Sequence, residues 1–63
     1  MKRSSLLAHL RRHGCALKRE GAAHSLWTNP ANGAMEAVPR HTEGPDVLAR
    51  EICRGLGIPE VGP

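Results

Sequence analysis

The sequence predicts a small α+β fold in which a helix, three antiparallel strands and a second helix follow one another. Two segments, one near each end, repeat apolar residues at spacings of three and four, as amphipathic helices do. Between them the chain favours short strands, separated by a small-residue turn and by a turn containing Asn-Gly. With 63 residues, the chain is long enough for one domain with a thin core.

The first helix is expected to begin at Ser4 or Ser5, because a serine hydroxyl can accept a hydrogen bond from a free backbone N–H of the first turn. Its buried face would hold three leucines, Leu6, Leu7 and Leu10. Basic residues 11–13 suit the negative end of a helix, and Gly14 is a suitable terminating residue.

Residues 15–20 alternate in polarity, which predicts a half-buried first strand, and residues 21–23 form a turn. The second strand is expected at residues 24–28, and Trp27, the sole aromatic residue of the chain, is expected in the core. In the following turn, residues 29–33, Asn32-Gly33 should supply the positive φ angles of a hairpin. The third strand would cover residues 34–38 and stop at Pro39.

The second helix is expected to begin at Pro45 or Asp46. Its apolar stripe consists of Leu48, Ile52 and Leu56, widened by Ala49 and Cys53. Gly57 should end it, with Ile58 folding back on the last turn. We therefore predict one domain over residues 1–58 and a mobile tail over residues 59–63. With both helices on one face of the sheet, this is the architecture of a double-stranded-RNA-binding domain in miniature, and the other face stays open.

Nine Lys and Arg against six Asp and Glu give a net charge of +3. This excess favours a polyanion or an acidic protein as the partner, although an ordinary solvated surface explains it equally well. No secretory signal and no long apolar run are recognisable, so we expect a cytoplasmic protein that does not span a membrane.

Neither the histidines nor the cysteines form a convincing metal site. His9 and His13 stand four apart on the first helix, but two ligands without a third make a poor site, so a solvated face is expected. Cys15 and Cys53 fall at apolar positions, which favours reduced, buried packing groups. We expect no metal and no cofactor.

His24 is the residue best suited to chemistry, because it follows a glycine-containing loop and opens an apolar strand. A histidine presented at such an edge can move protons near neutral pH. The alternative is a partly exposed strand histidine that only packs beside Trp27.

The chain resembles the HicA family of toxins from bacterial toxin–antitoxin pairs. The resemblance rests on Met1-Lys2-Arg3 before a short helix, Gly14 before the first strand, Arg19 before the loop and His24 after it. It continues in Val38-Pro39-Arg40-His41 at the end of the third strand and in the helix at residues 48–58. Where that family commonly has Gly-Ser-His, this chain has Gly21-Ala22-Ala23-His24-Ser25. The resemblance implies a ribonuclease that cuts mRNA in a bacterial or archaeal cytoplasm and that a HicB-like antitoxin protein inhibits.

The resemblance also implies that His24 is the catalytic residue. As general base it would take the proton of the RNA 2′-hydroxyl, so that neither a metal nor a small-molecule cofactor is needed. The residues expected to contact RNA are Lys2, Arg3, Lys18, Arg19, Arg40 and His41, and His41 is also the candidate proton donor to the leaving group. Two alternatives remain open: a non-catalytic RNA-binding module of the same fold, and an interaction domain for an acidic protein.

Overall fold

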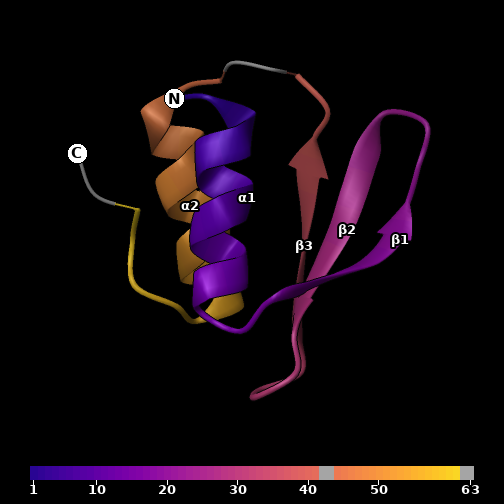
Figure 1. The fold of residues 1–63 in the computed structure, drawn as a ribbon, viewed down its shortest axis with the longest axis vertical. Coiled ribbons are helices and arrows are strands. Elements are labelled where there is room, and N and C mark those ends of the chain that lie inside the picture. The colour runs from indigo at the N-terminus through magenta and orange to yellow at the C-terminus, as the bar shows by residue number, and fades with distance from the viewer. Residues whose placement is uncertain (42–43, 62–63) are drawn as a thin grey trace.

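The structure, a computed structural model, describes residues 1–41 and 44–61. Its elements are α1 (Arg3–Arg12), β1 (Ala16–Glu20), β2 (His24–Asn29), β3 (Ala34–Pro39) and α2 (Asp46–Leu56). The strands form one antiparallel sheet in the order β1-β2-β3, and both helices lie on the same side of it (Figure 1). The predicted α-β-β-β-α architecture is confirmed.

The core lies between the two helices and the helix-facing side of the sheet. Its buried residues are Leu6, Leu7, Leu10, Cys15, Trp27, Val38, Ala49, Ile52, Cys53 and Leu56. The predicted apolar faces of both helices are therefore confirmed, except that Leu48 is only partly buried. Trp27 is 1% exposed, as expected of a core residue.

Cys15 and Cys53 both occupy the core as free cysteines, as expected of small packing groups. Burial raises the pKa of each thiol, and in Cys15 repulsion by Cys53 raises the pKa further. The two side chains are therefore held as neutral thiols at neutral pH.

Both helices end in the same way, at a glycine with positive φ. Gly14 (φ 86°) ends α1 and Gly57 (φ 73°) ends α2. After each glycine, the next N–H reaches back to the last turn: Cys15 donates to the Leu10 carbonyl at 2.9 Å and Ile58 to the Cys53 carbonyl at 3.1 Å. This is the Schellman motif, so the predicted termination of both helices is confirmed.

The predicted start of α1 is wrong, because Ser4 and Ser5 lie inside the helix. The helix begins at Arg3, and Lys2 precedes it without a side-chain capping bond. The chain end before this start is tied to the second helix: the Met1 amine donates to the Gly44 carbonyl at 2.8 Å and lies 3.1 Å from the Asp46 carboxylate.

The expectation of a half-buried first strand is also wrong. All five residues of β1 are exposed, and Figure 1 shows β1 as the strand farthest from the helices. The reason is its position at the edge of the sheet, beyond the reach of α1 and α2. Cys15, which we expected in this strand, is buried just before it.

The turn between β2 and β3 forms where the sequence predicts it, but its geometry differs in one respect. Gly33 has a positive φ of 75°, whereas Asn32 does not. The asparagine side chains instead bond to the turn backbone, with Asn29 Oδ1 accepting from Ala31 N–H at 3.1 Å and Asn32 Oδ1 from Ala34 N–H at 2.8 Å. Side-chain acceptance of this kind stabilises the turn without a second positive φ.

The described part of the tail, residues 59–61, contacts the domain. The Pro59 carbonyl lies 2.8 Å from His9 Nε2, Glu60 pairs with Arg54 at 2.9 Å, and Val61 packs against the core. Residues 62 and 63 lie outside the described residues, and mobility of the tail stays a prediction.

Candidate functional site

His24 is the first residue of β2, and it is exposed. Its neighbour Ser25 is only 1% exposed and faces the helices. Because successive side chains of a strand point to opposite faces, His24 faces the open side of the sheet. Trp27 lies on the helix side, so the alternative in which His24 only packs beside Trp27 does not fit the fold.

A β-bulge in β1 adds positive charge to the same face. Leu17 pairs with Trp27, and the next paired residue is Arg19, opposite Leu26, which leaves Lys18 as the extra residue. Without the bulge, Arg19 would stand opposite Ser25 and face the helices. A bulge lets two consecutive residues oppose one partner, and here it directs Lys18 and Arg19 to the open face that carries His24.

The remainder of the open face is mostly apolar. The register places Leu26 and Thr28 of β2 beside Met35 and Ala37 of β3. Lys18 extends over this surface, with its Nζ 3.4 Å from Met35 Sδ. Among the described residues of this face there is no Phe, Tyr or Trp side chain, and a base-stacking platform requires several aromatic rings. The groups of this face that could contact a phosphate backbone are Lys18 and Arg19.

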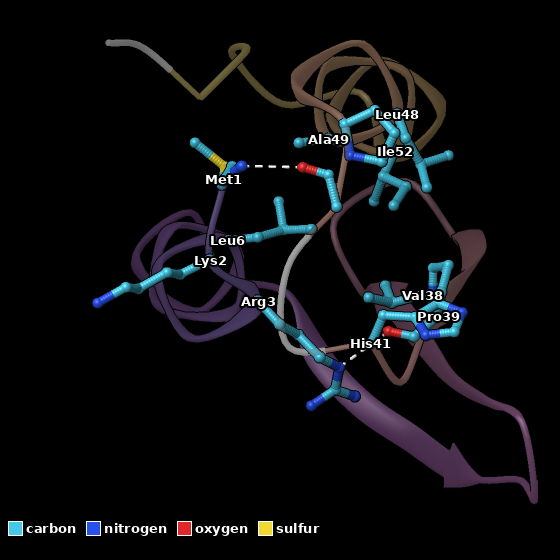
Figure 2. A pocket seen from close by; sticks show the side chains of 12 residues that line it. Met1, Lys2, Arg3, Leu6, Val38, Pro39, His41, Leu48, Ala49 and Ile52 are labelled. Atoms are coloured by element: carbon cyan, nitrogen blue, oxygen red, sulfur yellow. Dashed lines mark hydrogen bonds between the residues drawn. The ribbon is translucent and has the colours of Figure 1, made fainter.

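The helix-facing side of the same strand end holds a network of polar groups. The Ser25 hydroxyl donates to Glu20 Oε1 and accepts from Arg3 Nη2 at 2.8 Å. Arg3 Nε also donates to the Pro39 carbonyl at 2.9 Å, a contact drawn as a dashed line in Figure 2. Arg40 Nη1 lies 3.6 Å from Glu20 Oε1 and donates to the Gly21 carbonyl at 2.9 Å. Arg3 and Arg40 therefore bind groups of the protein itself.

The predicted site residues Lys2 and His41 lie at a pocket on the helix side of the sheet. The pocket has a volume of about 450 Å³, counting its part open to solvent, and is bounded by the first residues of α1 and α2 and the end of β3 (Figure 2). Its walls include Leu6, Val38 and Ile52. His41 contributes to this lining, so the fold does not bring the candidate proton donor to the face of His24.

The structure thus divides the predicted site residues into two sets. His24, Lys18 and Arg19 share the open face of the sheet. Lys2, Arg3, Arg40 and His41 lie at the same end of the molecule but belong to the helix side. Sequence reasoning missed Glu20 and Ser25 as partners of Arg3 and Arg40. The short turn at residues 21–23 was the available signal, because a hairpin closed there can pair Glu20 with Ser25 across the two strands.

The first helix presents its two histidines side by side, with ring centroids 4.5 Å apart. His13 is exposed, whereas His9 is half-buried and bound to Pro59. In the described part of the chain, no three His, Cys, Asp or Glu side chains cluster where they could share a metal ion. Among the same residues, neither helix has the length and apolar character needed to span a lipid bilayer.

Comparisons with family models, with curated proteins and with solved structures find no match for this chain. The chemistry of the site therefore rests on the chain's own residues.

Proposed function

We propose that the protein is a metal-independent endoribonuclease that cleaves mRNA, with His24 as its general base. The observation that carries the proposal is an exposed histidine on an open sheet face that also carries two cations, Lys18 and Arg19. An open sheet face suits a long polymer, which can lie across the strands. Sequence resemblance to HicA toxins points to the same activity.

The proposed reaction uses the nucleophile that RNA itself carries. His24 removes the proton of a 2′-hydroxyl, the 2′-oxygen attacks the adjacent phosphorus, and the bond from phosphorus to the 5′-oxygen breaks. The products are a 2′,3′-cyclic phosphate and a free 5′-hydroxyl. Proton transfer by a positioned side chain contributes about 10²–10⁴-fold to such rates. Arg19, opposite Leu26 and so the nearer cation, stabilises the negative charge that accumulates on the phosphorane. Lys18, whose Nζ lies at Met35, binds the RNA backbone farther along the same face.

Protonation of the leaving 5′-oxygen is assigned to water. Of the described residues on the open face, His24 is the one histidine and none is a carboxylic acid. His41, the alternative donor, lines the pocket on the helix side. The enzyme is therefore proposed to rely on one general base and two cations.

A HicB-like antitoxin is proposed as the protein partner, and this part of the proposal rests on the resemblance alone. Such a partner would inhibit the enzyme by covering His24. Because it would bind the folded toxin, it would also raise the free energy of unfolding by mass action.

The test is to incubate the purified protein with a long mRNA in excess EDTA, beside the His24→Ala variant and the charge-preserving control Arg12→Lys. The parent and the control should cut the RNA and leave 2′,3′-cyclic phosphate ends, whereas His24→Ala should not. Cleavage by His24→Ala at the parent's rate would remove His24 from the mechanism.

A second function is favoured because the described part of His24's face holds neither a second histidine nor a carboxylic acid to protonate the leaving group. In this reading the protein binds RNA through Lys18 and Arg19 without cutting it. The same experiment separates the two readings, because a binding module would retard the mRNA on a native gel and leave its length unchanged in every variant.

A further inference from the structure

We propose that four residues on the helix side of the sheet, Arg3, Glu20, Ser25 and Arg40, act as a clamp that positions His24 from behind. The inference rests on the proposed ribonuclease function, and it goes further by assigning positioning residues to it. None of the four would touch the RNA at the reacting bond. Each instead fixes the backbone from which the imidazole projects.

The first contact of the clamp is made through Ser25, the residue next to His24. Its side chain is buried, and its hydroxyl bonds both the Glu20 carboxylate and the Arg3 guanidinium. A buried hydroxyl that accepts from one charged group and donates to another has a single favourable orientation. Fixing the backbone at Ser25 therefore also fixes the direction in which the His24 side chain projects from the opposite face of the sheet.

The second contact is made through the loop that precedes His24. Arg40 holds this loop twice: its guanidinium binds the Gly21 carbonyl at 2.9 Å, and its backbone N–H binds the Ala23 carbonyl at 3.3 Å. Gly21 N–H in turn donates to the His24 carbonyl at 2.8 Å. Arg40 also pairs with Glu20, so one arginine joins the loop to the Ser25 contact.

The third contact is made through β3, the strand that pairs with His24. The cross-strand partner of His24 is Pro39, which has no N–H to donate to the ladder. Its carbonyl accepts a hydrogen bond from Arg3 Nε at 2.9 Å. The strand end opposite His24 is thereby tied to α1, and the imidazole itself remains free to meet a substrate.

The variant that tests the clamp is Glu20→Gln, because an amide keeps an acceptor for Ser25 and removes the charge that pairs with Arg40. The matched control is Glu51→Gln, on the exposed surface of α2. Ser25→Ala is a second variant, but Ser25 is buried and its loss could destabilise the whole fold. The test therefore depends on Glu20→Gln. Arg40→Lys and Arg40→Met form a rescue pair, since lysine keeps the charge and methionine only the length.

The first measurement is amide hydrogen exchange at Gly21 and Arg40 in the full chain, which does not depend on activity. Glu20→Gln and Arg40→Met should accelerate exchange at both amides by about tenfold or more, whereas Glu51→Gln should leave both unchanged. Unchanged exchange in Glu20→Gln would overturn the clamp, whether or not the protein cuts RNA.

The second measurement is the rate of RNA cleavage in EDTA, with kcat and KM separated. Displacing a catalytic group by about 1 Å can cost on the order of 10²-fold, so Glu20→Gln should lower kcat by about tenfold to a hundredfold and leave KM within about twofold. Arg40→Lys should retain more activity than Arg40→Met. Faster exchange with an unchanged kcat would show that these contacts stabilise the loop but do not position His24, and it would overturn the proposal. If the parent cuts no RNA, the proposed function fails, and the clamp is judged by exchange together with the order of the His24 ring in NMR relaxation.

Discussion

The side chain of Asn29, at the end of β2, donates from Nδ2 to the backbone carbonyl of Leu56 at 2.8 Å. Leu56 is the last residue of α2, where carbonyls have no partner within the helix. Asn32 donates to the same carbonyl at 3.1 Å. The β2–β3 turn therefore closes the C-terminal end of α2 and joins the sheet to the helix at the end of the molecule opposite His24.

Asn29→Asp should destabilise the protein because it replaces the amide donor with a carboxylate that faces the Leu56 carbonyl. Asn29 is 5% exposed, so water cannot fully compensate, and a loss of about 1–3 kcal/mol is expected. Urea unfolding followed by circular dichroism measures it. Asn32→Asp, at an exposed site with a longer bond to the same carbonyl, should cost less; equal losses would contradict a special role for Asn29.

Gly21→Ala should destabilise the first hairpin. A Cβ at Gly21 would stand 2.8 Å from the His24 carbonyl oxygen, closer than real Cβ contacts allow. The loop would have to shift, at a cost of about 1–3 kcal/mol. Gly44→Ala is the control, because a Cβ there meets nothing within 4 Å. Thermal unfolding of the two variants should show a clear loss for Gly21→Ala and little change for Gly44→Ala.

Lys18→Gln should weaken RNA binding and reduce its dependence on salt. Each phosphate contact that is removed lowers the slope of log K against log salt by about 0.7 for single strands and about 0.9 for duplexes. Arg12→Gln, on the exposed end of α1, is the control with the same loss of charge. Fluorescence anisotropy of a labelled RNA at several salt concentrations measures both slopes. Equal changes in the two variants would indicate net charge rather than the open face.

Raising the pH should destabilise the protein through Cys15 and Cys53. The pKa of each thiol is raised by burial in the folded state, so the unfolded chain loses these protons at lower pH than the folded one. Their contribution to the free energy of unfolding is complete below the unfolded pKa, about 8.5, and is lost as the pH rises through the folded pKa.

The decline is at most about 1.4 kcal/mol per pH unit for each thiol. Urea unfolding at about pH 7 and about pH 10 measures it. Cys15→Ala and Cys53→Ala each remove one titrating thiol, so each should show a smaller difference between the two pH values than the parent. A difference that is the same in all three proteins would exclude the thiols as its source.

Much of the fold was predictable because the signals are local. Gly14 and Gly57 end their helices through a backbone conformation that glycine adopts without strain. The leucines of α1 and the apolar residues of α2 recur with the helical period. That period indicates which face of each helix is buried, without knowledge of what packs against it. The same holds for His24, whose place after a short loop already put it at the start of a strand.

The tertiary structure decided what local patterns leave open. The bulge at Lys18 depends on how β1 aligns with β2, and it determines that Arg19 faces the side of His24 rather than the helices. The edge position of β1 left it exposed, although its alternating sequence predicted a half-buried strand. Arg3 and Arg40 became partners of Ser25 and Glu20 because α1 packs on the sheet and β3 pairs with β2, which brings together residues that are distant along the chain. The sequence by itself determined which segments form helices and strands and that His24 begins a strand, because these features depend on interactions within a few residues. Which charges share a face with that histidine depends on strand register and on long-range hydrogen bonds, and these exist only in the folded chain.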